Sequence, residues 1–149
     1  MNYATGIFVD PKGYIYVSDG GNHRVVKWDF AGNAIGWIGH NRDGWQTGEA
    51  PNNSGKNYKS FYGPSGIYVD TDGTIYIADI GNHRVCKWSA DGIAIGWIGG
   101  GNNGWQTTSA PSLGTDSKSF SHPVNIRSVS NGILYNVDNY NNRISKWQE

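Results

Sequence analysis

Apolar and polar residues alternate along short stretches of this chain, and turns rich in Gly, Asp and Asn separate the stretches. A period of two residues predicts β-strands, because alternate side chains of a strand point to opposite faces. No stretch has the spacing of an amphipathic helix. The first such group of strands is predicted at Gly6–Asp10, at Tyr14–Ser18, in a segment ending at Trp28, and at Ala34–Ile38.

The same pattern returns along the chain, so the sequence is an internal repeat. Thr5–Gly39 and Ser65–Gly99 are identical at 22 of 35 positions without a gap, and Val124–Trp147 keeps 8 of 24 identities with the second copy. Repeats of this kind stack on one another, because one copy cannot bury its own apolar faces. The second copy predicts strands at 66–70, 74–78, a segment ending at 88, and 94–98. The third copy predicts them at 125–129, 133–137 and a segment ending at 147, and it stops before a fourth strand.

The best-preserved part of the repeat carries a family resemblance. Residues 66–85 read Gly-Ile-Tyr-Val-Asp, a turn, Ile-Tyr-Ile-Ala-Asp and then Gly-Asn-His-Arg-Val. This pattern resembles the NHL repeat, and the resemblance implies an all-β propeller built from four-stranded antiparallel blades. One domain over 1–149 would then hold blade 1 at about 5–39, a loop at 40–64, blade 2 at about 65–99, a loop at 100–123 and a partial blade 3 at about 124–147.

The two long loops also repeat one another. Each contains Gly-Trp-Gln-Thr, then Ala-Pro, then Lys-Ser-Phe, and a passive spacer has no reason to preserve such residues. The two tryptophans either clamp the loop onto its own blade or offer a flat ring to a ligand. An aromatic ring beside neutral amide and hydroxyl groups suits an uncharged partner. The candidate ligand-binding residues are therefore Trp45, Gln46, Thr47, Trp105, Gln106 and Thr107, on the face that also carries the turns between the second and third strands.

A second set of polar residues recurs where the second strand of each copy turns into the third. An Asp that ends one strand and an Arg that begins the next face each other across the hairpin, where a carboxylate can accept from a guanidinium and from turn N–H groups. The third copy keeps this frame but has Asn142 where the others have His, which argues against metal ligation. The set is interpreted as a structural network: Asp19, Asn22, His23, Arg24, Asp79, Asn82, His83, Arg84, Asp138, Asn141 and Arg143.

The sequence gives little support for a catalytic site. The unrepeated titratable residues in the loops show no metal-ligand spacing, and the sequence contains no Glu-x-x-His, His-x-His or nucleophile-elbow pattern. We therefore expect no catalytic residue, metal or cofactor. The expected function is a non-enzymatic binding or scaffolding module for protein or carbohydrate. The alternatives are a structural block that self-assembles into a closed propeller and a metal-dependent propeller lyase or hydrolase.

Charge and apolar content restrict the partners. Twelve basic and twelve acidic residues balance, so neither nucleic acid nor an anionic membrane is an expected partner. No apolar run approaches the roughly 20 residues of a membrane span, so we expect a soluble chain. The sequence does not determine its compartment: the chain could be secreted or belong to a longer extracellular protein. The lone Cys86 is expected to be a buried, unreactive side chain.

The number of predicted strands bears on self-association. Two blades and a partial third form an arc whose two end faces would be apolar, whereas a ring needs about four blades or more to close. Head-to-tail pairing hides both faces. We therefore expect a homodimer with six blades.

Overall fold

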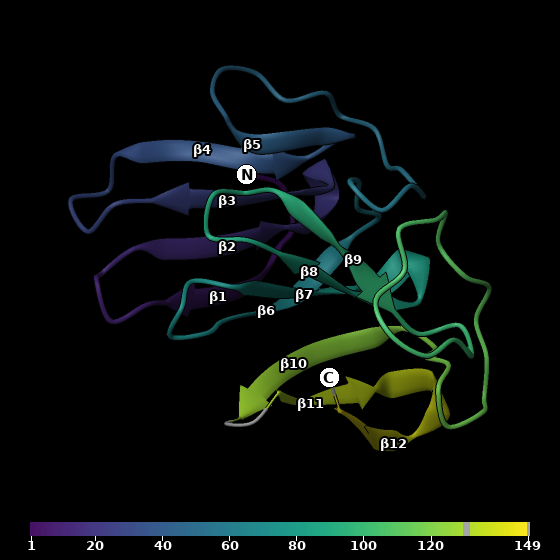
Figure 1. Ribbon diagram of the computed structural model, residues 1–149. Helices are drawn as coiled ribbons and strands as arrows, with labels where there is room; N and C mark the ends of the chain where they lie inside the picture. Colours follow the sequence, from purple (N-terminus) through teal and green to yellow (C-terminus); the bar gives the residue numbers. More distant parts are fainter. Residues whose placement is uncertain (130–131, 149) are drawn as a thin grey trace.

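The structure, a computed structural model, describes residues 1–129 and 132–148 and consists of three antiparallel sheets (Figure 1). The first sheet contains β1 (Ala4–Val9), β2 (Ile15–Asp19), β3 (Arg24–Trp28), β4 (Ala34–Gly39) and β5 (Arg42–Gln46). The second contains β6 (Pro64–Val69), β7 (Ile75–Asp79), β8 (Arg84–Trp88) and β9 (Ala94–Ile98). The third contains β10 (Pro123–Val129), β11 (Ile133–Asp138) and β12 (Arg143–Gln148). Strands follow chain order in every sheet, which confirms the expected antiparallel, all-β fold.

Short 3-10 helices link the second and third strands of each sheet: η1 (Gly20–Asn22), η2 (Ile80–Asn82) and η3 (Asn139–Asn141). Each ends on a residue in the left-handed region, with φ of 52° at His23, 54° at His83 and 50° at Asn142. Asn and His enter this region more readily than most non-glycine residues do. Among the described residues no helix is long and apolar enough to cross a bilayer.

Most strand ends differ from the prediction by one or two residues, and part of one predicted loop is a strand. The segment 40–64 was expected to be a loop, but its start turns back to form β5, which pairs with β4 so that Trp37 lies opposite Gln46. In the second sheet this pairing shrinks to a single bridge between Trp97 and Gln106. The turn between the predicted strands 125–129 and 133–137 lies partly outside the described residues.

The sheets stack along the chain through their first strands. The Thr5 hydroxyl donates to the Pro64 carbonyl at 2.8 Å, and the Ser65 hydroxyl donates to the Val124 carbonyl at 3.0 Å. Neighbouring backbones approach closely there, since a Cβ on Gly6 would lie 2.2 Å from the Ser65 carbonyl oxygen. Only glycine fits such an approach.

The core lies between the sheets. One cluster joins Tyr16, Val25 and Ile38 of the first sheet to the near face of the second, and another joins the far face of the second to Ile126 and Leu134. The strand tryptophans pack in this core to different depths: Trp88, Trp97 and Trp37 are 0%, 1% and 3% exposed, whereas Trp28 and Trp147 are half-buried.

Candidate functional site

The repeated Asp–Asn–Arg set forms a closed network, which is most buried in the second sheet. The Asp79 carboxylate accepts from the Arg84 Nε at 2.8 Å, from the Asn82 amide at 2.8 Å and from the Tyr62 backbone N–H at 2.7 Å. Asp79 and Arg84 lie directly opposite each other in the β7–β8 register, and both side chains are fully buried. The Cys86 thiol lies 3.7 Å from the same carboxylate, and burial raises its pKa, which keeps it protonated and unreactive.

In the second and third sheets, the network also fastens the long loop that precedes the sheet. The Arg84 guanidinium donates to the carbonyls of Lys56, Asn57 and Ser60 at 3.2, 2.8 and 2.7 Å. The Asn82 amide donates to the Gly55 carbonyl at 2.8 Å. The third sheet repeats this pattern on the second loop, where Arg143 and Asn141 donate to the carbonyls of Gly114, Thr115, Asp116 and Ser119.

The first sheet keeps only the hairpin part of the network. Arg24 Nε donates to Asp19 at 2.7 Å, and the Asn22 amide donates to both oxygens of the same carboxylate. The Asn2 backbone N–H donates to Asp19 at 2.6 Å, as Tyr62 does to Asp79. Burial acts to raise the pKa of Asp19, but the hydrogen bonds from Asn2, Asn22 and Arg24 bring it below its ordinary value.

The histidines of the repeat join one sheet to the next. The Gly63 backbone N–H donates to His23 Nδ1 at 3.1 Å, and the His122 backbone N–H donates to His83 Nδ1 at 3.3 Å. Burial, and secondarily the neighbouring His122, lower the pKa of His83. Accepting through Nδ1 requires the neutral ring, so these contacts belong to the unprotonated form.

Acid should therefore weaken the second–third sheet contact. Because the folded pKa of His83 lies below the ordinary value of about 6.5, the unfolded chain takes up the proton first, and the free energy of unfolding falls as the pH drops through that value. His83→Asn should reduce this dependence, since Asn142 occupies the same left-handed position in the third copy. Melting temperatures of wild type and variant at pH 7.5 and 5.5 measure it. An equal fall in both proteins would contradict the assignment.

The two loop tryptophans lie elsewhere than predicted. The Trp45 indole N–H donates to the Ala90 carbonyl at 2.9 Å, in the β8–β9 turn, and its ring lies 6.1 Å from that of Tyr16. That turn is at the opposite end of β8 from η2, so the prediction that Trp45 shares a face with the strand 2–3 turns is wrong. Trp105 makes the equivalent ring contact with Tyr76 at 6.2 Å, and Lys87 Nζ lies 5.1 Å from its ring centroid.

The glutamines next to these tryptophans form hydrogen bonds to the backbone, and the threonines face solvent. The Gln46 and Gln106 amides each donate to two carbonyls within their own loop, and Thr47 and Thr107 are exposed. The loops are clamped instead by strand tryptophans: Trp37 Nε1 donates to Gly48 and Trp97 Nε1 to Thr108, at 3.0 and 2.9 Å. The sequence analysis left open whether Trp45 and Trp105 clamp the loops, and it did not consider Trp37 and Trp97 for this role.

A hollow that the sequence did not indicate lies at the η2 end of the molecule. We call this end, made of η1–η3 with the loop segments 53–62 and 110–121, the loop face. The hollow measures about 300 Å³ and is lined by Lys56, Gly81, Asn82, His83, Ala110, Pro111, Ser112 and Leu113. Asn82 Oδ1 is buried and has no hydrogen-bond partner among the described residues, while the Leu113 side chain is 57% exposed. The hollow therefore sets apolar side chains beside polar ones, while Asn82 Oδ1 itself stays buried.

The unrepeated titratable residues of the loops do not converge. Asp43 pairs with Lys59, Asp116 accepts from Ser119 at 2.7 Å, and His40 Nε2 lies 3.2 Å from the Asn22 carbonyl oxygen. Within residues 1–129 and 132–148, no group of three or more His, Cys, Asp or Glu side chains is placed to hold a metal ion.

Solved structures with a similar fold come from several bacterial proteins. One is a catalytically inactive virginiamycin B lyase from Staphylococcus aureus with quinupristin, at 13% identity and a TM-score of 0.59, covering 100% of this chain and 42% of that one. Two others are auxiliary nutrient binding proteins. The Bacteroides ovatus protein has 18% identity and a TM-score of 0.62, and the Bacteroides thetaiotaomicron protein has 20% and 0.57; each match covers 94% of this chain and 36% of the other.

This chain thus spans less than half the length of each of these proteins, and identities this low support a shared fold, that of the β-propeller, and nothing finer. The family model for the NHL repeat matches residues 1–28 and 61–88, and neither segment includes the third copy. The two matches cover the first three strands and the Asp–Asn–Arg network of the first and second sheets. Residues 1–28 and 61–88 are therefore NHL repeats, carried on a β-propeller-like fold.

Proposed function

We propose that this chain is a non-enzymatic binding module that recognises a protein or a carbohydrate through its loop face. The observation that carries the proposal is the fixed backbone of the loops, which Arg84 and Arg143 hold by hydrogen bonds to carbonyl oxygens. A loop that is already ordered loses little conformational entropy when a partner binds. Irregular backbone on a rigid scaffold is the usual place of a binding surface.

The chemistry of the hollow indicates the kind of partner. Lys56, His83 and Ser112 of the lining carry polar groups that can bind a hydroxyl or an amide N–H of a ligand, whereas Asn82 Oδ1 is buried and out of a ligand's reach. Pro111 and Leu113 offer apolar contact beside these polar groups. Sugars and peptide loops both combine such donors with apolar patches. Two solved structures of similar fold are called nutrient binding proteins, which favours a binding role.

The polar network argues for structure over catalysis. Asp79, Asn82 and Arg84 spend their donors and acceptors on one another and on loop carbonyls, so little of the network remains for a substrate. Trp105, Gln106 and Thr107 form a second proposed contact surface, because no described residue accepts from the Trp105 indole N–H as Ala90 does from Trp45. Trp45 already donates its indole N–H to the second sheet, so Trp45, Gln46 and Thr47 are the weaker candidates.

A binding screen tests the proposal. Wild type is applied to a glycan array and a peptide array, and each positive probe is titrated against the double variant Lys56→Ala/Leu113→Ala and against Trp105→Ala. Both loop-face side chains are exposed, so the double variant should keep its melting temperature and lose affinity at least tenfold. Phe30→Ala, at an exposed apolar residue in the β3–β4 turn, is the matched control. Binding that no variant changes, or no bound probe at all, would refute the proposal.

A further inference from the structure

The stacked sheets form the same kind of interface twice, between the first and second sheets and between the second and third. The outer faces of the first and third sheets are the two halves of one more such interface. Tyr16 and Val25 face the second sheet and are 2% and 0% exposed, and Tyr76 and Val85 face the third and are 3% and 0% exposed. The corresponding residues of the third sheet, Tyr135 and Ile144, are 38% and 73% exposed. The third sheet thus shows the apolar face that its predecessors bury.

The first sheet shows the complementary face. Ile67 and Val69 of β6 are 2% and 3% exposed, because they pack against the first sheet. Their counterparts in β1, Ile7 and Val9, are 67% and 56% exposed. Soluble proteins seldom leave apolar residues of such a size side by side in water. The two open faces have the same residue types as the two faces that already meet inside the chain.

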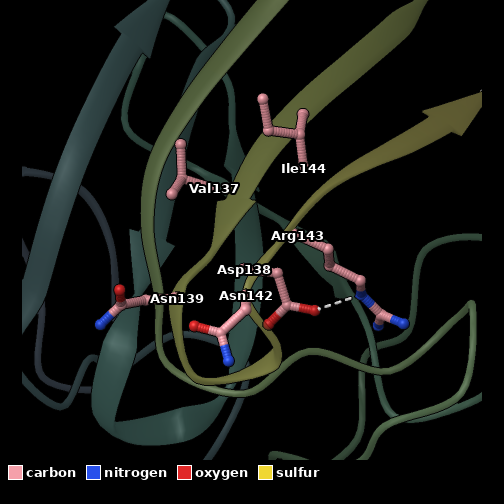
Figure 2. A pocket seen from close by; sticks show the side chains of 6 residues that line it. All are labelled: Val137, Asp138, Asn139, Asn142, Arg143 and Ile144. Carbon is pink, nitrogen blue, oxygen red and sulfur yellow. Dashed lines mark hydrogen bonds and ion pairs between the residues drawn. The ribbon is translucent and has the colours of Figure 1, made fainter.

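The third sheet has a hollow at the position where the first and second sheets each contact the sheet that follows them. The hollow measures about 310 Å³, and Figure 2 shows Val137 and Ile144 toward one end and the Asn139 and Asn142 amides toward the other. In the first and second sheets the corresponding place is occupied by the start of the following sheet, where Gly63 donates to His23 and His122 donates to His83.

The start of the chain already has the conformation that this place accepts. Gly63 and His122 have φ of 62° and 53°, and Tyr3, at the same position of the repeat, has φ of 48°. The residue before each donates its N–H to the repeat carboxylate, as Asn2 does to Asp19 at 2.6 Å. The Tyr3 side chain is 83% exposed. The N-terminal segment is therefore preorganised as an insert.

We propose that the open face of the third sheet binds the first sheet of a second copy of this chain. Tyr3 of the second copy enters the hollow and donates its N–H to Asn142, while Tyr135 and Ile144 pack against Ile7 and Val9. The same contact made in return closes a twofold ring of six sheets and leaves neither face open. A net charge of zero on the chain gives no overall repulsion between copies.

One residue makes the new junction looser than the internal ones. A Cβ on Gly6 would lie 2.2 Å from the Ser65 carbonyl oxygen, and one on Gly66 would lie 2.5 Å from the Asn125 Cα. The third sheet has Asn125 at this position, so β10 and the β1 of the second copy must stand further apart than β1 and β6 do. Asn125→Gly should therefore tighten the dimer.

Light scattering on the 149-residue chain tests the proposal. Wild type at micromolar concentration should have about twice the 16.3 kDa chain mass. Ile7→Asp and Ile144→Lys should each shift the protein to a single chain, since both place a charge in the buried contact. Phe30→Asp, 83% exposed and outside both faces, is the control and should stay dimeric.

Mixing the two variants separates lost contact from lost folding. A heterodimer of Ile7→Asp and Ile144→Lys has one junction with wild-type residues and one with the opposite charges paired, so mass should return to two chains. Asn125→Gly should lower the dissociation constant about tenfold. A monomeric wild type, a dimer that neither charged variant dissociates, or a mixture that stays monomeric while both variants melt cooperatively would overturn the proposal.

Discussion

Arg84→Ala should lower the free energy of unfolding by about 3–5 kcal/mol, because it leaves the Asp79 carboxylate buried without its ion partner. The change also removes three hydrogen bonds to the carbonyls of Lys56, Asn57 and Ser60. Asp79→Ala should cost a similar amount, since it strands a guanidinium that has no exposed surface. Urea unfolding followed by tryptophan fluorescence measures both.

Arg24→Ala is the matched control for this prediction. Arg24 makes the same pairing across its hairpin, but its side chain is 20% exposed, and it fastens no loop among the described residues. Its loss should cost clearly less than the loss of Arg84. Arg84→Lys keeps the charge but not the planar fork, so it should fall between wild type and Arg84→Ala. Equal losses at positions 24 and 84 would show that burial and loop anchoring do not set the stability of the network.

Trp88→Ala should also destabilise by about 3–5 kcal/mol, the range for removing a large aromatic side chain from a core. Trp88 is fully buried in the cluster between the first and second sheets, and its ring centroid lies 5.3 Å from that of Phe61. Phe61 belongs to the first long loop, so the cavity would loosen loop and sheet together.

Two further variants define the cause of that loss. Trp88→Phe keeps most of the ring packing and removes a buried indole N–H that has no hydrogen-bond partner in the described part of the chain, so it should cost much less than alanine. Trp28→Ala removes the half-buried counterpart in the first sheet and should also cost less. If Trp28→Ala were as costly as Trp88→Ala, burial between sheets would not be the deciding factor.

Local patterns were enough to predict the strands of the repeat. Alternating apolar residues and Gly- or Asp-containing turns predict each hairpin from a few neighbouring residues, and the Asp-to-Arg spacing places Asp79 opposite Arg84. β5 escaped prediction because Arg-Asp-Gly-Trp-Gln has no apolar alternation and is held by backbone pairing with β4.

The site was harder to predict because its contacts are distant in sequence. Trp45 finds its acceptor at Ala90, and the loop-face hollow gathers Lys56, His83 and Leu113 from three separate segments. No motif links these residues, so only the folded chain brings them together. The third sheet's hollow is likewise visible only when its exposed residues are set beside their buried counterparts in the earlier sheets.

The loop anchoring also imposes an order on folding. Each loop is fastened by the sheet that comes after it in the chain: segment 55–60 by Asn82 and Arg84, and segment 114–119 by Asn141 and Arg143. During synthesis from the N-terminus, the first loop cannot lock until β8 has left the ribosome. In the finished protein, opening the third sheet releases the second loop while the first stays fastened. Backbone amides of 114–119 should consequently exchange with solvent sooner than those of 55–60.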